Sequence, residues 1–168
     1  QDLETEQEAY KYYMDAVKRD GIPYELIEKA LPTIEGEVND ILAQMVDFGI
    51  VLEMDGKNIN TYLAYDDDNV WPLELSSGME RFISSLAMRV GLINVCNLPR
   101  ANFLAIDEGF GNMDSDNLNS VYSLFQYLKS QFQFAFIVSH IESMRDTVDS
   151  LLEISKENGF SQLKLPSK

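Results

Sequence analysis

The fold of this chain is decided by the segment Asn102–Asp114, which has the sequence NFLAIDEGFGNMD. Four apolar residues, Phe103 to Ile106, lead directly into two carboxylates, Asp107 and Glu108. This pattern is typical of a buried strand that delivers its acids at its carboxyl end, where open α/β sheets place their chemistry. One acid at such an edge can hold a hard cation and the other can orient a water. The segment also fits an ordinary strand that leaves the core into a polar loop.

A second apolar strand is predicted at residues 134–138, after a helix at 115–132. Strand, helix and strand in this order predict a right-handed βαβ unit with parallel strands, so the expected fold class is α/β. Both strands then end at the same edge of the sheet, which brings Ser139 and His140 near the two acids. His140 is the only histidine of the sequence. A lone histidine is more often structural, but this position favours a role at the site.

A third informative segment, at residues 75–81, reads Leu-Ser-Ser-Gly-Met-Glu-Arg. Ser77 and Glu80 are three residues apart, which predicts a capping box at the start of a helix. Many core helices are capped in this way. Alternatively, Ser76, Gly78 and the free N–H groups of the first turn could hold a phosphate. The segment alone leaves both interpretations open.

The other segments predict helices and hairpins. Residues 1–20 show heptad spacing and fit either the end of a coiled coil or a surface helix. An apolar stripe predicts a second helix from Pro23 to Met45, after a break at Gly21. Asp-Gly and Asn-Gly pairs predict two hairpins, one turning near residue 56 and one near residue 159.

Composition limits the classes of function. The chain carries 28 acidic and 13 basic residues, a net charge of -15, so its average charge does not attract a phosphate backbone. One cysteine, Cys96, excludes an internal disulfide and fits a reducing compartment. No apolar run approaches the ~20 residues of a membrane-spanning helix, so no membrane partner is expected. Because the chain opens at Gln1, we expect it to be a piece of a longer protein.

Together, the segments resemble the C-terminal lobe of the ATP-binding cassette (ABC) ATPases. Residues 75–79 resemble the signature motif, 103–108 the Walker B strand, 111–114 the D-loop and 138–140 the switch histidine. The most similar branch is the SbcC-like ATPases of DNA double-strand-break repair, which are relatives of the structural-maintenance-of-chromosomes (SMC) proteins. The run Ile-Asp-Glu-Gly-Phe-Gly at 106–111 and the long helix after it carry this resemblance.

The sequence departs from the family pattern in three ways. Met79 stands where the family usually has Gln or Glu, and Ser77 replaces a usual glycine. No Gly-x-x-x-x-Gly-Lys-Ser/Thr loop occurs in the 168 residues. In SbcC-like proteins this Walker A loop belongs to an N-terminal lobe, which a long antiparallel coiled coil separates from the C-terminal lobe.

The resemblance therefore implies a division of the chain. Residues 1–46 are expected to be the end of a coiled coil with connecting helices, and 47–168 an ABC ATPase C-terminal lobe. Such a lobe has a P-loop NTPase-like parallel sheet with flanking helices and β-hairpins. Residues 1–46 are also the candidate docking surface for a partner nuclease.

The implied cofactors are ATP and Mg²⁺. By this resemblance Asp107 helps to hold Mg²⁺, Glu108 polarises the attacking water and His140 contacts the γ-phosphate. Such a site works by positioning donors and a cation around developing charge.

The implied partners start with a second copy of the head. Ser76, Ser77, Gly78 and Asp114 would contact ATP bound to the opposite protomer, so that ATP lies between two heads of a homodimer. The Walker A lobe, DNA and a metallo-phosphoesterase-type nuclease complete the expected assembly, in the cytoplasm, nucleoid or nucleus. Two alternatives stay open: an SMC-type chromosome-organising ATPase without a nuclease, and an ABC-like scaffold that does not hydrolyse ATP.

Overall fold

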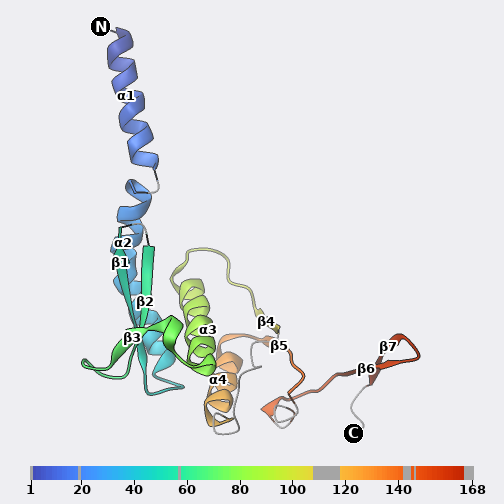
Figure 1. Ribbon diagram of the computed structural model, residues 1–168. Coiled ribbons are helices and arrows are strands. Elements are labelled where there is room, and N and C mark those ends of the chain that lie inside the picture. The colour runs from blue at the N-terminus through green and yellow to red at the C-terminus, as the bar shows by residue number, and fades with distance from the viewer. Residues whose placement is uncertain are drawn as a thin grey trace. The chain divides into compact units, whose positions relative to one another are not determined.

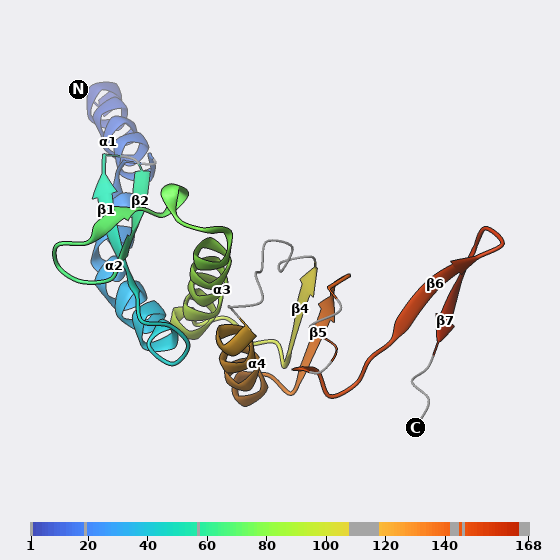
Figure 2. The same ribbon diagram turned by 60° about the horizontal axis from the view of Figure 1, so that its bottom comes forward.

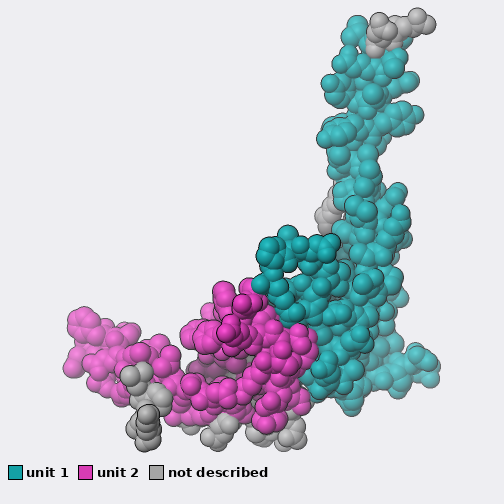
Figure 3. All heavy atoms as spheres, turned by 180° about the vertical axis from the view of Figure 1, so that it is seen from behind, with its two compact units in different colours: residues 1–100 teal, residues 101–168 magenta. Residues whose placement is uncertain are grey.

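The structure, a computed structural model, describes residues 2–18, 20–56, 58–107, 118–141, 145 and 147–164 (Figure 1). The chain forms two compact units, residues 1–100 and 101–168, which Figure 3 colours teal and magenta. Helices and strands occur in both units, so the predicted α/β class is confirmed. The division of the chain at residue 46, between the end of a coiled coil and an ATPase lobe, stays a prediction.

Two helices open the chain: α1 spans Asp2–Val17 and α2 spans Ile22–Leu42. Both were predicted from the sequence. α2 has proline in its first turn, where the missing N–H costs no hydrogen bond, and it continues through Pro32. None of the described helices is long and apolar enough to cross a membrane. The heptad-spaced residues of α1 are exposed, as expected of one helix of a coiled coil: Leu3, Tyr10 and Val17.

The first unit contains an antiparallel sheet in the order β1-β2-β3, formed by Gly49–Asp55, Asn58–Ala64 and Val70–Pro72. The last residue of β1 pairs with the first residue of β2 across a two-residue loop. Gly56 in this loop has φ +59°, a conformation that glycine adopts without strain. The hairpin predicted from the Asp-Gly pair is therefore confirmed.

Helix α2 packs against both β1 and helix α3, which spans Gly78–Val95. The Asn39 side chain satisfies both backbone groups of Ile50, accepting from its N–H at 2.7 Å and donating to its carbonyl at 2.9 Å. The Leu52 N–H donates to Glu35 at 2.6 Å. These bonds serve the edge of β1 that β2 does not pair, so α2 covers that edge. The core between these elements includes the buried residues Val38, Ile41, Leu42, Ile50, Leu63, Ile83, Leu86 and Val90.

Gly91 is the point of close approach between α2 and α3. A Cβ atom added at Gly91 would lie 2.8 Å from Cγ2 of Val38, which is fully buried. Gly36, on α2, has open space at the same position. Alanine favours a helix over glycine by about 1 kcal/mol, whereas overpacking costs about 1–3 kcal/mol.

We therefore expect Gly91→Ala to lower the free energy of unfolding by about 1 kcal/mol, and Gly36→Ala to raise it by up to about 1 kcal/mol. Urea unfolding of the chain measures both. Adding Val38→Ala should relieve the overlap, so the Gly91→Ala/Val38→Ala pair should be less destabilised than the sum of the single changes. A stabilising Gly91→Ala would contradict this close packing.

The second unit contains the predicted strand-helix-strand sequence. β4 spans Phe103–Asp107, α4 spans Leu118–Gln131 and β5 spans Phe134–Val138. β4 and β5 pair in parallel over their whole length, and Figure 2 shows the two arrows side by side. The predicted parallel unit is confirmed within the described residues. The part of the predicted helix before residue 118 lies outside them.

The strands of this pair are less buried than the sequence predicts. Parallel strands are normally covered on both faces, and an apolar run such as Phe-Ala-Phe-Ile-Val indicates a buried strand. In β4 and β5, Ile106 alone is buried. The expectation of buried strands is therefore wrong for this chain on its own, because its described residues leave apolar side chains of both strands open. The exposed fractions of these side chains are 59% for Phe103, 59% for Phe134, 45% for Phe136 and 41% for Val138.

A closing hairpin ends the described chain. β6 spans Glu153–Glu157 and β7 spans Phe160–Lys164, and they pair antiparallel. Asn158 (φ 51°) and Gly159 (φ 86°) form the two-residue turn with positive φ that hairpins favour. This hairpin was predicted from the Asn-Gly pair. The helix predicted near residues 141–148 falls partly outside the described residues.

Candidate functional site

The signature segment lies in the first unit, between a short 3-10 turn, η1 (Leu73–Leu75), and helix α3. Ser76 is 8% exposed, and its hydroxyl donates to the Leu73 carbonyl at 2.6 Å. The Ser76 N–H donates to the same carbonyl at 3.2 Å. The hydroxyl hydrogen is thus engaged within its own turn. A phosphate contact through this hydroxyl requires exchange of that bond.

The predicted capping box at the start of α3 is confirmed. The Ser77 hydroxyl accepts from the Glu80 N–H at 3.2 Å, and the Glu80 carboxylate accepts from the Ser77 N–H at 2.6 Å. Within the described chain, the N–H groups of Gly78 and Met79 have no acceptor. These two amides lie at the positive end of the helix dipole, where an anion is favoured. They are the groups of this turn that can donate to a phosphate.

Met79 contributes differently from its counterpart in the resembled family. Its side chain is 7% exposed and belongs to the core of the first unit. The Gln or Glu that usually stands here could make a polar contact, whereas Met79 offers only its backbone N–H. This amide is one of the free N–H groups expected in the first turn, because the capping box occupies the N–H groups of Ser77 and Glu80 and leaves those of the two residues between them.

Glu80 has a second partner that the sequence pattern does not predict. The Tyr65 hydroxyl donates to Glu80 at 2.6 Å, from the residue just after β2. This hydrogen bond, then partial burial and the negative charges of Glu80 and Asp47, raise the pKa of Tyr65 to about 12. Burial pushes the pKa of Glu80 upward, but hydrogen bonds from Tyr65 and Ser77 outweigh it and lower that pKa. Glu80 is therefore held as a carboxylate.

The second unit carries the predicted acidic strand end. Asp107 is the last residue of β4 and pairs with Val138, the last residue of β5. The chain leaves both strands at the same edge, so Asp107 ends one strand and the Ser139-His140 pair follows the end of its neighbour, as predicted. The Ser139 hydroxyl accepts from the Ile141 N–H at 3.1 Å, which fixes the turn that contains His140.

Asp107 fits the donor type that Mg²⁺ takes. Its carboxylate is exposed at the strand end, and Mg²⁺ in nucleotide sites is held by one or two carboxylates together with phosphates and water. No cluster of three or more metal-ligating side chains occurs among the described residues. Glu108 and Asp114, the other two predicted acids, lie outside the described residues.

The amino-acid sequence of the chain is similar to those of known proteins. The chain is 34% identical over 178 residues to uncharacterized protein R555 of Acanthamoeba polyphaga mimivirus, covering 96% of this chain and 13% of that protein. It is 33% identical over 91 residues to the SbcC component of the nuclease SbcCD of Pseudomonas aeruginosa, covering 53% of this chain and 8% of that protein. The chain is an SbcC/SMC-like ABC ATPase C-terminal lobe. It spans 13% or less of the lengths of these two relatives. No protein-family model matches it.

Solved structures give the same fold for this SbcC/SMC-like lobe. A Pyrococcus furiosus Smc head domain with an extended coiled coil matches with a TM-score of 0.66 and 18% identity, over 99% of this chain and 42% of that one. That head was solved with the C-terminal domain of ScpA bound. The SMC head domain of Thermotoga maritima matches with a TM-score of 0.59 and 19% identity, over 86% of this chain and 51% of that one.

Proposed function

We propose that this SbcC/SMC-like lobe is the C-terminal half of an ATP-hydrolysing head that acts in DNA repair and recombination. ATP and Mg²⁺ bind between two heads, and hydrolysis controls the access of DNA to a partner nuclease. The observation that carries this proposal is the parallel register of Asp107 with Val138, because it sets an acid and His140 at one edge of the sheet. Phosphoryl transfer needs such positioned groups around a cation.

The residue roles follow from the resemblance and the local chemistry. Asp107 is the Mg²⁺ ligand, Glu108 orients the attacking water, and His140 contacts the γ-phosphate. These roles suit groups at the carboxyl edge of a parallel pair.

The signature turn and the D-loop act on the nucleotide of the opposite head. Ser76, Ser77, Gly78 and Asp114 are the proposed residues. The free N–H groups in the first turn of α3 support a phosphate contact there. ATP then holds two heads together, and its hydrolysis releases them.

A Walker A lobe is the partner that completes the nucleotide pocket. The exposed apolar side chains of β4 and β5 support this, because a two-stranded parallel sheet is expected to gain further strands or covering helices. We expect that lobe to come from the same polypeptide or from a second chain.

The partner nuclease is proposed to dock on residues 1–46. Apolar side chains are exposed on α2 as well as on α1, among them Ile22 (54%) and Leu26 (61%). Exposed apolar surface on adjoining helices is typical of an interaction site. We place the whole assembly inside the cell, on DNA.

Reconstitution tests the proposed ATPase. The chain alone should hydrolyse ATP at the background rate, because it lacks the lobe that cradles the phosphates. Mixing it with its N-terminal lobe should raise the steady-state rate of phosphate release by at least about 100-fold. This is the smallest effect on rate expected when a single catalytic group is added or removed. Robust hydrolysis by the chain alone would contradict the proposal. A mixture with Asp107→Asn is the matched control and should stay near background.

Purification of the full-length protein tests the nuclease partnership. A metallo-phosphoesterase-type nuclease should co-purify in stoichiometric amount and lose its association when the exposed residues Ile22 and Leu26 are both replaced by serine. ATPase activity without any nuclease would instead favour the chromosome-organising alternative.

A further inference from the structure

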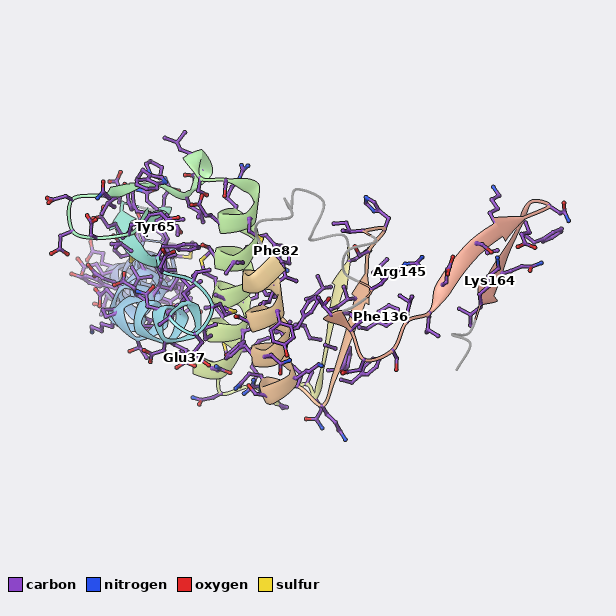
Figure 4. The ribbon with its side chains drawn as sticks, turned by 90° about the horizontal axis from the view of Figure 1, so that it is seen from below. Glu37, Tyr65, Phe82, Phe136, Arg145 and Lys164 are labelled. Atoms are coloured by element: carbon purple, nitrogen blue, oxygen red, sulfur yellow. The ribbon has the colours of Figure 1, made fainter. Side chains whose placement is uncertain are left out.

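The Tyr65 side chain contacts two aromatic rings. Its ring centroid lies 5.6 Å from that of Phe48, at an interplanar angle of 58°, and 5.5 Å from that of Trp71, at 30°. Figure 4 labels Tyr65 beside the sheet of the first unit. Contact with two rings at these distances restricts the movement of the tyrosine ring. The position of the Tyr65 hydroxyl group, and so its distance to the acceptor, is restricted as well.

That acceptor is one oxygen of Glu80, and the other oxygen serves the signature turn. Oε1 of Glu80 accepts from the Tyr65 hydroxyl at 2.6 Å, while Oε2 accepts from the Ser77 N–H at 2.6 Å. Both bonds involve a charged acceptor and are therefore stronger than neutral ones. The carboxylate thus joins a rigid aromatic residue to the backbone of the turn. Tyr65 and Glu80 are 15 residues apart, so this link is tertiary and not part of the local capping box.

We propose that Tyr65 is a positioning residue for the signature turn: through Glu80 it fixes the backbone at Ser77 before the opposite head's nucleotide arrives. This inference rests on the proposed function. With the Ser77 N–H held by Glu80, the N–H groups of Gly78 and Met79 keep their direction and remain available. A turn fixed in advance does not have to be ordered when the heads meet, which favours engagement.

The hydroxyl of Tyr65 can be removed without removing its packing. Phenylalanine can make the same ring contacts with Phe48 and Trp71, and Tyr65 is 40% exposed, so Tyr65→Phe leaves no large cavity. Tyr62, on the preceding strand β2, is the matched control. Its hydroxyl has no hydrogen-bond partner within the described chain.

The experiment measures ATP-dependent dimerisation of the full-length protein by analytical ultracentrifugation, with a non-hydrolysable ATP analogue as the probe. Binding of a fluorescent ATP analogue at a protein concentration that keeps heads apart is the second readout. Tyr65→Phe should weaken dimerisation by about three- to tenfold, the scale of ordering one side chain or short turn during binding. Nucleotide binding to separate heads should be unchanged, and Tyr62→Phe should behave as the unmodified protein does.

A double-mutant cycle shows whether Tyr65 acts through Glu80. In a Glu80→Ala background, Tyr65→Phe should have no further effect on dimerisation. A residue with only a structural role would lower the unfolding temperature without this split between dimerisation and nucleotide binding. Equal dimerisation by Tyr65→Phe and the unmodified protein overturns the proposal for Tyr65 alone. No dimerisation by the unmodified protein overturns the proposed function, and with it this inference.

Discussion

Replacing Glu108 by glutamine in the full-length protein is expected to lower ATP turnover by about 10²–10⁴-fold, the range for losing a general base. Glutamine keeps the size of the side chain but cannot accept the proton of the attacking water. Because binding of ATP does not use this base, ATP-dependent dimers should persist and accumulate. Steady-state phosphate release measures the first effect, and light scattering with ATP measures the second.

Glu53→Gln is the matched control for Glu108→Gln. Glu53 is an exposed carboxylate on β1, outside the proposed site, and the substitution makes the same change in charge. It should leave turnover unchanged. If Glu108→Gln also left turnover unchanged, Glu108 would have no part in hydrolysis.

Replacing Ser76 by arginine should weaken ATP-dependent dimerisation by about 30-fold or more, the scale of a binding hot spot of 2 kcal/mol or more. Ser76 is 8% exposed and sits in a tight turn, so an arginine side chain has to leave the turn and enter the space proposed for the opposite head. Binding of ATP to separate heads should be retained, because the proposed contact lies across the dimer. Ultracentrifugation with ATP checks the first result, and nucleotide titration checks the second.

Two controls separate this effect from misfolding and from charge. Ser76→Ala loses the bond to the Leu73 carbonyl but adds no bulk, so its dimers should be weakened much less than those of Ser76→Arg. Ser150→Arg adds the same charge at an exposed position of the second unit and should dimerise normally. Dimers of unreduced affinity in a folded Ser76→Arg protein would contradict the trans contact.

Local features of the site could be predicted from the sequence because their determinants lie within a few residues. The capping box needs only Ser77 and Glu80 at a spacing of three. The hairpins need only a turn pair that accepts positive φ, as at Gly56 and Gly159. The parallel direction of β4 and β5 follows from the order of strand, helix and strand, since a helical crossover carries the chain back to the edge where the first strand began.

Other features could not be predicted from the pattern of residue types alone. Nothing in the local pattern shows that the Ser76 hydroxyl turns toward its own 3-10 segment. The open faces of β4 and β5 also escaped prediction, because an apolar run shows that a strand needs cover and not whether this chain supplies it.

The order of residues was enough to establish most segments as helices, strands and turns, the α/β class, and the placement of Asp107 and His140 at one strand edge. Short-range backbone geometry and the parallel pairing that a helical crossover imposes decide these features. The tertiary structure was needed to show that the Tyr65 hydroxyl donates to Glu80 and that Gly91 leaves room for the Val38 side chain. It also showed that Asn39 bonds to the free edge of β1. These contacts join residues 11 to 53 positions apart, and packing of whole elements, which no local pattern encodes, brings them together.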